Sequence, residues 1–442
     1  MTKVVSIIRE QKATERQQFI LDTFAECFGD LMRANPRAWR SKFRKMAASA
    51  FAFYRGSAAL FYADVSREQD PFLDEKTSRV WIQGDLHAEN FGTYMNGAGL
   101  LVFDVNDYDE AYVAPFTWDV KRLVASLALI GHQKAMSDDE IRQLIAAAAR
   151  GYVDQVARFH QGLDADFALR LDNTSGALLA ILKDARLLTR VGLLDSRTEI
   201  VDGDRRFRVS APDIRVDAAT RADVEAAFDI YAKSIPPDKR RATLSYKIKD
   251  VIQLCRAGIG SAGLLFFSVL LEGETQALEN DLIVGMKVAQ PAAPSRFVDD
   301  ARIVNYFEHD GHRTAVSQRA LQAHADPLVG YSTLNGRGMF IAELSPYGVD
   351  LDWENLNQLD EMLPLITCLG RAAAKIHCVS DVDSDQTLVP FSTEEAIHNV
   401  IAGREDEFVQ EMVEFGESYG AVVRGDHQLF VEAFRNHLFA DI

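Results

Sequence analysis

The strand-like segments of this sequence gather in one stretch of the chain, with helical patterns on both sides of it. Apolar runs separated by glycine and acidic turns predict strands over residues 251–255, 264–271, 282–288, 328–333 and 338–344. Within that stretch, one helix is expected over 313–324. Because helices and strands are grouped rather than alternating, we expect an α+β fold whose sheet-forming segments stand between two helical regions of the chain.

The helical regions carry recognisable signals. Apolar residues at helical spacing over 19–31 predict an N-terminal helix, and a second, basic helix is expected over 39–46. Helical patterns also cover 117–129 and the chain beyond Trp353. Three further helix starts are marked by a Ser or Thr three positions before an acidic residue, at Ser137/Glu140, Thr220/Asp223 and Ser392/Glu395.

Composition and charge argue against several classes of protein. The chain has 442 residues, of which 48% are hydrophobic and 26% charged, as in an ordinary globular protein. Its formal net charge of -17 is a poor match to nucleic acid or to an anionic membrane surface, so we expect neither as a partner.

Cysteine usage and hydropathy favour a cytoplasmic protein. The four cysteines are scattered along the chain, at Cys27, Cys255, Cys368 and Cys378. This spacing indicates reduced thiols rather than a disulfide framework or a zinc site. The N-terminus becomes charged before a long apolar run develops, and no run approaches the roughly 20 apolar residues of a membrane span.

The strongest local signal is the heptapeptide GDLHAEN at residues 84–90, which follows a short strand predicted over 79–82. A second short strand, over 100–103, ends at Asp104. Phosphoryl transfer from ATP requires a group that takes the proton of the acceptor hydroxyl, and ligands for the Mg²⁺ that neutralises phosphate charge. The motif supplies that set, with Asp85 as the base and Asn90 and Asp104 as metal ligands.

The acidic residues after Asp104 offer alternatives. Asp107 is the second choice as metal ligand, because a carboxylate at a strand end, such as Asp104, can point into a cleft. Asp109 and Glu110 are interpreted as a solvated acidic loop. The alternative for the whole motif is a polar turn between two strands, which leaves the spacing of four specific polar residue types unexplained.

The other parts of an ATP site are predicted later in the chain. Residues 258–263 match GxGxxG between two predicted strands, a context typical of a phosphate-covering glycine loop rather than of a dinucleotide fold. The residues expected to approach the phosphates are Gly258, Gly260, Ser261 and Gly263. Lys287, on the strand over 282–288, would reach phosphate oxygens, and its alternative is an edge-strand lysine that extends into solvent.

Residues 84–104 are similar to the catalytic loop of aminoglycoside-phosphotransferase-like kinases, which carry Gly-Asp-x-His-x-x-Asn before a strand that ends in a metal-binding Asp. The resemblance implies that His87 supports this catalytic loop and that Asp119 braces it. Residues 369–377 resemble the helix that directly precedes the catalytic loop in those kinases. Since catalytic loop and glycine loop occur here in swapped order, the resemblance implies a circularly permuted, protein-kinase-like fold of two lobes.

This resemblance divides the chain into four parts, with a boundary at Pro236-Pro237. They are an N-terminal helical region (1–80), the catalytic-loop part of a helical lobe (81–237), a nucleotide-binding lobe with an antiparallel sheet and one helix (238–345), and C-terminal helices that complete the helical lobe (346–442).

The motifs together resemble a widespread bacterial family of unknown function, domain-of-unknown-function family 2252. The matching stretches are residues 53–56, 84–92, 103–110, 118–123 and 258–263, Lys287, Gln318-Arg319 and the helix of His377. They span most of the chain, and the family implies no established substrate.

One departure from the kinase pattern concerns the partner of Lys287. Kinases pair this lysine with a Glu on the following helix, but the helix expected over 313–324 has no central carboxylate. The candidate substitutes are Gln318, Glu308 and Glu343. Arg55, Arg313 and Arg319 are interpreted as solvated or structural cations, with phosphate contact as the alternative.

Several functions follow from these motifs. We expect an ATP- and Mg²⁺-dependent phosphotransferase that acts on a small-molecule or protein hydroxyl. The alternatives are AMP transfer by the same fold, a kinase-like module that binds nucleotide without turnover, and a metallophosphoesterase. The last is suggested by Gly84-Asp85-x-His87, although the upstream Asp-x-His of such enzymes is absent. Neither the acceptor nor the oligomeric state is indicated by a motif.

Overall fold

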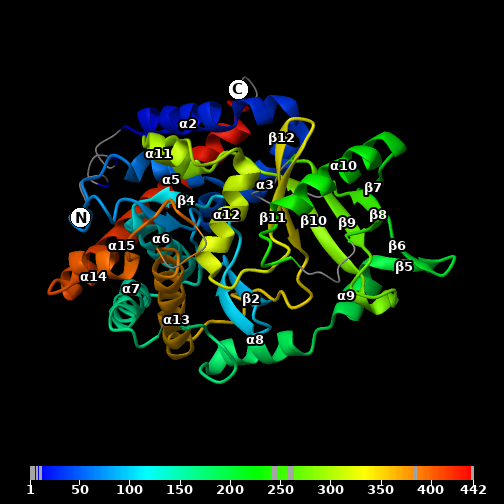
Figure 1. Ribbon diagram of the computed structural model, residues 1–442. Helices are drawn as coiled ribbons and strands as arrows, with labels where there is room; N and C mark the ends of the chain where they lie inside the picture. Colours follow the sequence, from blue (N-terminus) through cyan, green and yellow to red (C-terminus); the bar gives the residue numbers. More distant parts are fainter. Residues whose placement is uncertain are drawn as a thin grey trace.

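The computed structural model describes residues 5, 8, 12–164, 166–240, 246–255, 263–382, 384 and 386–439. Helices dominate both ends of the chain, and an antiparallel sheet of six strands stands to one side of them, which confirms the expected α+β class (Figure 1).

The α-helices of the described residues are α2 (Ala13–Ala34), α3 (Pro36–Met46), α4 (Ala50–Gly56), α5 (Ala58–Val65), α6 (Phe116–Gln133), α7 (Asp138–His160), α8 (Gly176–Arg186), α9 (Arg190–Arg197), α10 (Ala218–Ser234), α11 (Ala301–Val304), α12 (Asp310–Gln322), α13 (Leu359–Cys378), α14 (Thr393–Ile401) and α15 (Glu405–Arg435). The strands are β1 (Val80–Ile82), β2 (Phe91–Met95), β3 (Leu101–Val105), β4 (Tyr112–Ala114), β5 (Thr198–Val201), β6 (Asp204–Phe207), β7 (Ile214–Arg215), β8 (Ile248–Gln253), β9 (Phe266–Leu271), β10 (Leu282–Val288), β11 (Gly330–Leu334) and β12 (Arg337–Glu343).

The six-stranded sheet has the order β11-β12-β10-β9-β8-β7, with every neighbouring pair antiparallel. Successive residues of β10 point to opposite faces of the sheet. Val284 and Met286 pack on the face that α10 covers. Lys287 therefore points to the other face, where Phe340 of β12 packs against Ala315 of α12. Because the far side of α12 joins the main core of the helical part, Lys287 faces toward that part. Figure 1 shows α12 between the sheet and the helices.

The strands and the helix predicted in the β-rich stretch correspond to β8 to β12 and α12. The two short strands predicted before it correspond to β1 and β3, but each pairs with a strand that sequence analysis missed. β1 pairs with β4, and β3 pairs with β2. β2 contains Gly92 and the polar Thr93, and β4 has only three residues, so neither shows a strand pattern of its own.

Two of the three predicted helix starts are confirmed. Ser137 begins α7 with a complete capping box, and the Ser392 side chain caps α14. α10 begins earlier than predicted, because the Asp217 side chain accepts a hydrogen bond from the backbone N–H of Thr220 and takes the capping role. Asp is at least as good an N-cap residue as Thr, and Asp217 precedes Thr220 by three positions.

Hydrophobic packing groups the segment from α9 to α10 with the sheet. Phe228 and Tyr231 of α10 lie on one sheet face, and Leu194 of α9 with Phe207 of β6 lies against another part of the sheet. β7, which precedes Pro236-Pro237 in the chain, is the edge strand.

The helical part is held by close helix contacts. α13 packs along α7, and α15 packs along α6. A Cβ at Gly370 would lie only 2.0 Å from the carbonyl oxygen of Ala148, and one at Gly151 only 2.3 Å from that of Thr367, so α7 and α13 meet backbone to backbone. This contact fixes the position of α13, whose C-terminal turns reach the loops described below.

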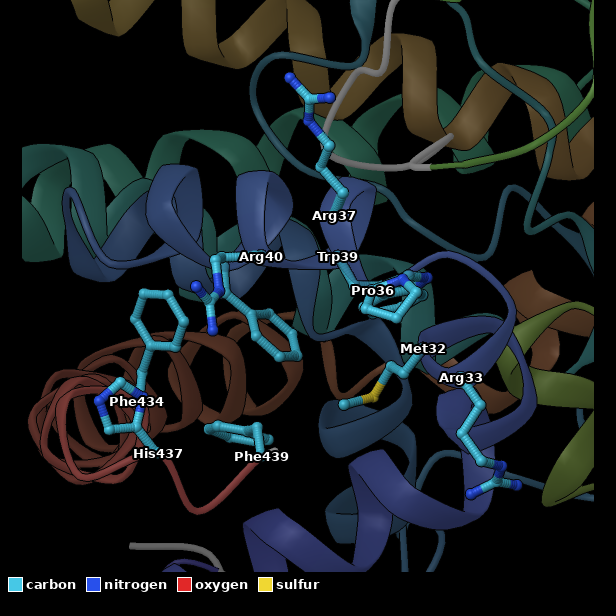
Figure 2. A pocket seen from close by; sticks show the side chains of 10 residues that line it. Met32, Arg33, Pro36, Arg37, Trp39, Arg40, Phe434, His437 and Phe439 are labelled. Carbon is cyan, nitrogen blue, oxygen red and sulfur yellow. The ribbon is translucent and has the colours of Figure 1, made fainter. Parts of the chain in front are cut away.

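Two further features concern the surface. Within the described ranges, no helix is both long enough and apolar enough to cross a bilayer. A cavity of about 610 Å³ opens between α2, α3 and the end of α15 (Figure 2).

Candidate functional site

A buried aspartate of α6 holds the loop that carries Asp85. Asp119 Oδ2 accepts a hydrogen bond from the backbone N–H of Gln83 at 2.6 Å, and its Oδ1 accepts one from Gly84 at 3.0 Å. The Nε2 atom of His377, on α13, lies 3.3 Å from Asp119 Oδ2. Asp119 thus braces the loop, and the helix of residues 369–377 lies directly against this brace although it comes far later in the chain.

The Asp85 loop packs backbone to backbone against the loop that follows β3. Gly84 has φ +81°, and a Cβ there would lie 1.9 Å from the carbonyl oxygen of Glu110. The Gln83 side chain donates to two carbonyl oxygens of the second loop, one of them that of Asp107, and its Oε1 accepts from the N–H of Asp85. Gln83 therefore ties the two loops together. Sequence analysis missed this residue, because a glutamine before the motif has no chemical signature.

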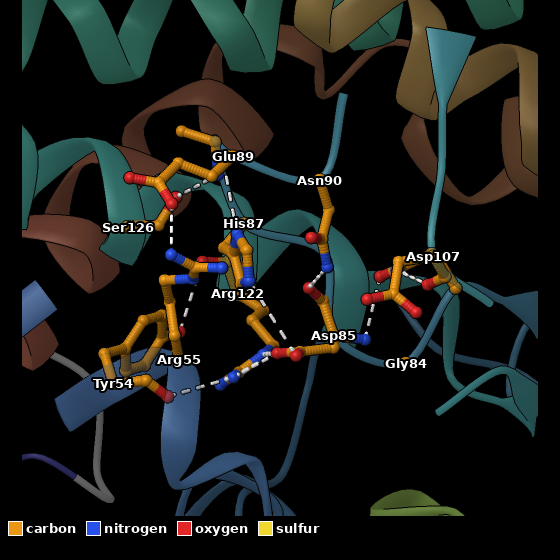
Figure 3. Close-up of polar contacts among 12 residues, drawn as sticks. Tyr54, Arg55, Gly84, Asp85, His87, Glu89, Asn90, Asp107, Arg122 and Ser126 are labelled. Carbon is orange, nitrogen blue, oxygen red and sulfur yellow. Dashed lines mark hydrogen bonds and ion pairs between the residues drawn. The ribbon is translucent and has the colours of Figure 1, made fainter. Parts of the chain in front are cut away.

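Asp85 lies in an ion pair with a fully buried arginine (Figure 3). Its Oδ1 accepts hydrogen bonds from Nε of Arg122, at 2.7 Å, and from Nη2. The guanidinium of Arg122 lies 4.3 Å from the centroid of the Tyr54 ring. Desolvation of the carboxylate outweighs the attraction of Arg122 and raises the pKa of Asp85 to about 6. Asp85 is therefore ionised at pH 7 and still basic enough to accept a proton.

The geometry of His87 agrees with a supporting role. Its Nδ1 accepts a hydrogen bond from the N–H of Glu89 at 3.2 Å, so in the neutral ring the proton is assigned to Nε2, which lies 3.8 Å from Asp85 Oδ2. Burial and the nearby cations of Arg55 and Arg122 hold the pKa of His87 well below its usual value. At 3.8 Å the two atoms are too far apart for a hydrogen bond, and a neutral ring in this position does not compete with Asp85 for protons.

Asn90 and Asp107 lie beside Asp85 (Figure 3). The Asn90 amide nitrogen donates to the carbonyl oxygen of Asp85 at 2.9 Å, which leaves its amide oxygen for a cation. Asp107 has φ +56°, a left-handed conformation that is uncommon for non-glycine residues but that Asp adopts more readily than most. Desolvation and then the charge of Asp109 raise the pKa of Asp107 to about 6. Asp107 is in turn one of the charges that raise the pKa of Asp85.

Asp104, the first choice of metal ligand, is engaged elsewhere. Its Oδ2 accepts from Nζ of Lys375 at 2.5 Å and from the hydroxyl of Tyr94 at 3.0 Å, and its Oδ1 accepts from a backbone N–H. Asp104 lines a separate cavity of about 210 Å³, whose lining includes neither Asp85 nor Asp107. The structure does not bring Asp104 together with Asp85, because the pleat of β3 turns this carboxylate toward α13.

Lys287 reaches the second loop from the sheet. Its Nζ lies 2.6 Å from Oδ2 of Asp109, a residue 178 positions earlier in the chain. Burial alone would lower the pKa of Lys287, but the carboxylates of Asp109 and Asp107 outweigh it and raise that pKa. The sequence predicts the lysine's partner on the following helix and a solvated loop at Asp109, whereas the structure pairs Lys287 with Asp109. An ion pair between such distant segments leaves no local pattern in the sequence.

The residues weighed as partners of Lys287 make other contacts. Gln318 donates to the side chain of Gln322, and Glu343 pairs with Arg190 at 2.8 Å. The backbone N–H of Glu308 donates to Nδ1 of His312.

The three arginines that were considered for phosphate contact have structural partners. Arg313 of α12 donates to the carbonyl oxygens of Ala111, at 2.6 Å, and Asp109, at 2.8 Å, and so fixes the second loop to the sheet part. Arg319 donates to backbone carbonyl oxygens, and Arg55 pairs with Glu89.

The glycine loop is described only at its end. Gly258, Gly260 and Ser261 lie outside the described residues. Gly263 has φ +77°, and a Cβ there would lie 3.0 Å from the amide nitrogen of Asn35, the N-cap of α3. The end of this loop therefore packs against α3, an element that sequence analysis did not connect with it.

Comparison with known protein families gives a match over most of the chain. No curated protein and no solved structure matches the chain. A family model matches residues 33–433, a span that contains both loops, the sheet and α13. The chain therefore belongs to DUF2252, a family of uncharacterised proteins conserved in bacteria.

Proposed function

We propose that this protein is an ATP- and Mg²⁺-dependent phosphotransferase acting on a hydroxyl of a small molecule or protein, built on a circularly permuted, two-lobed, protein-kinase-like fold. The observation that carries the proposal is the ion pair of Lys287 with Asp109. It joins the lysine of β10 to the loop that contains Asp107, and Gln83 joins that loop to Asp85. These contacts connect three proposed functional residues: a phosphate-binding lysine, a metal ligand and a base. The lysine comes from a segment that is distant in the chain from the other two.

The oxygen donors near Asp85 suit Mg²⁺. In the part of the chain that the structure describes, no three His, Cys, Asp or Glu side chains are grouped as a ready metal site, which gives the metallophosphoesterase alternative no support. Mg²⁺ commonly takes one or two protein oxygens and completes its shell with water and substrate phosphates. Asp107 and the amide oxygen of Asn90 are the proposed ligands, and the ion would neutralise phosphate charge there. Asp104 does not fill this role in the proposal, since Lys375 already pairs with it.

Asp85 is the proposed base. Arg122 holds Oδ1 of Asp85, whereas Oδ2 lies 3.8 Å from His87 Nε2. Oδ2 is therefore the oxygen that would orient the acceptor hydroxyl and take its proton. With a pKa of about 6, Asp85 is ready for this step at neutral pH.

Lys287 would bind phosphate oxygens in competition with Asp109. Nζ of Lys287 lies 5.5 Å from the centroid of the Phe340 ring. Rotation about the bonds of the flexible lysine side chain would let the amine exchange the Asp109 carboxylate for a phosphate.

Binding and transfer can be separated by substitution. Asp85→Asn should keep Mg²⁺-dependent binding of an ATP analogue but lose transfer by about 10²- to 10⁴-fold. Lys287→Met and Asp107→Asn should weaken binding at least about tenfold. The matched control is Lys247→Met, which removes an exposed lysine paired with Glu272 near the end of β8, and it should change neither. Calorimetry measures binding, and product analysis with ATP and a fractionated bacterial extract measures transfer.

The products distinguish the remaining functions. Release of ADP supports phosphoryl transfer, release of pyrophosphate indicates AMP transfer, and tight binding without either product indicates a nucleotide-binding module. Full transfer activity in Asp85→Asn, or unchanged nucleotide binding in Lys287→Met, would contradict the assignment of these residues.

A further inference from the structure

The cavity beside α3 is a concave site separate from the loops of Asp85 and Asp107. Its volume of about 610 Å³ lies in the range typical of small-molecule pockets. Its lining combines basic and aromatic side chains, among them Arg33, Trp39, Arg40, Phe43, Phe434 and Phe439 (Figure 2). These residues come from α2, α3, the last turn of α15 and the chain that follows it.

The charged residues that line this cavity are all basic. Its described lining contains three arginines and His437 but neither Asp nor Glu, although the whole chain has a formal net charge of -17. Arg33 pairs with the exposed Asp30. Arg37 and Arg40 are exposed, and within the described ranges neither forms an ion pair with a carboxylate. Two arginines left without counter-ions in an acidic protein favour an anionic ligand.

Apart from Met32 and Pro36, the rest of the lining is aromatic. Phe43 is the centre, with ring centroids 5.7 Å from Trp39, 5.7 Å from Phe434 and 4.8 Å from Phe439. Trp39 is 4% exposed, and its indole N–H has no hydrogen-bond partner among the described residues. A buried donor without a partner is unfavourable unless a ligand or water satisfies it.

We propose that this cavity binds a small amphipathic anion. An acyl or aryl body would lie against the rings of Trp39, Phe43 and Phe439, and a carboxylate, sulfonate or phosphate head would pair with Arg37 and Arg40. Neither part suffices alone: the rings provide apolar contact, and the arginines select the charge. The cavity is distinct from the proposed phosphotransfer site, because neither Asp85, Asp107 nor Lys287 lines it.

The test uses the full chain and pairs of probes that differ in charge. Decanoate and naphthalene-2-sulfonate are titrated below their aggregation limits, with decyltrimethylammonium and naphthylmethylamine as cationic counterparts of the same bodies. Both anions should bind and quench tryptophan fluorescence, and the cations should bind at least about tenfold more weakly. Trp39→Phe should abolish most of the quenching, which assigns the signal to this cavity.

Charge reversal within one helix provides the matched control. The double variant Arg37→Glu/Arg40→Glu should weaken binding of both anions at least about tenfold. Arg44→Glu, an exposed arginine of α3 that does not line the cavity, should change binding less than about twofold. Circular dichroism and thermal unfolding of each variant report whether the fold is intact.

Three results would overturn the proposal. One is equal binding of the anionic and cationic probes, and another is equal weakening by Arg44→Glu and by the double variant. The third is binding to anionic phospholipid vesicles without binding to either free anion, which would indicate a membrane-surface patch instead of a cavity site.

Discussion

Three carboxylic acids around the Asp85 loop have raised pKa values. Asp85, Asp107 and Glu110 each have a pKa of about 6, and desolvation is the largest cause for each. A carboxyl group whose pKa rises on folding contributes stability below its unfolded pKa, and this contribution is lost as the pH rises through the folded pKa. At pH 7 the three anions therefore oppose folding, and a bound cation would relieve that cost.

The titration of these acids predicts a pH-dependent response to Mg²⁺. Above pH 6 the carboxylates are charged and Mg²⁺ should raise the melting temperature, whereas at pH 5, where they are mostly protonated, the increase should largely disappear. Asp107→Asn should reduce the increase at pH 8. Differential scanning fluorimetry across pH 5–8 measures the effect, and an equal Mg²⁺ response at both ends of the range would contradict it.

Lys42 of α3 is a buried lysine held between rings, with Nζ 4.4 Å from the centroid of Trp39 and 5.0 Å from that of Phe28. Burial lowers its pKa to about 8. Between pH 8 and pH 10.5 the unfolded chain binds more protons at this site than the folded chain, so the lysine makes the protein more stable as the pH rises through that window.

Lys42→Met should remove this pH dependence. At pH 7 the variant should be more stable than the wild type by about 1 to 3 kcal/mol, since it avoids burying a charge but loses the cation–π contacts. Urea unfolding at pH 7 to pH 10.5 compares the two proteins. If the variant is less stable than the wild type at pH 7, burial of the lysine carries no such cost. The same holds if its unfolding free energy changes with pH as steeply as that of the wild type.

At the scale of elements, the turn at Gly84 sets how closely the two loops approach. Gly84→Ala should destabilise the protein by several kcal/mol, because its Cβ would overlap the Glu110 carbonyl and its φ is +81°. Gly99 has a similar φ of +75° but open space around it, so Gly99→Ala measures the cost of the backbone conformation alone. We expect this destabilisation to be about 1 kcal/mol. Urea unfolding of both variants measures the difference, and equal losses would mean that the clash is relieved by a small backbone shift.

The same loops show what the sequence could predict. GDLHAEN was recognisable because its chemistry demands particular residue types at short spacing, and β10 because of its strong apolar run. The direction of an acidic side chain was not recognisable. Asp104 and Asp107 are three positions apart, and what separates them is the pleat of β3 and Lys375, which lies 271 positions after Asp104. Partners at that distance cannot be read from a local pattern.

At the scale of the whole molecule, one buried arginine joins the first and last long helices that the structure describes. Arg16 of α2 pairs with Asp64 of α5 and with Asp426 of α15, each at 2.7 Å. Burial of two carboxylates is tolerated here because they share this cation, and the Tyr419 hydroxyl donates to Asp64 as well, at 2.8 Å.

Arg16→Met should destabilise the protein by about 3 to 5 kcal/mol, because it leaves two buried carboxylates without a cation. The matched control is Arg33→Met on the same helix, whose pair with Asp30 is exposed and should matter little. Urea unfolding measures both variants, and hydrogen exchange should show faster opening of α2 and α15 in the first. Similar stabilities for the two variants would contradict a structural role for Arg16.

The long separation between the aspartates of the early loops and their partners on α13 matters while the polypeptide is being made. Asp104 and Asp119 leave the ribosome 271 and 258 residues before Lys375 and His377. At elongation rates of about 5–20 residues per second, the aspartates wait roughly 13 to 54 seconds for those counterparts. Until then the segment with Asp85 lacks its final support, so the proposed site is complete only after nearly all of the chain has been synthesised.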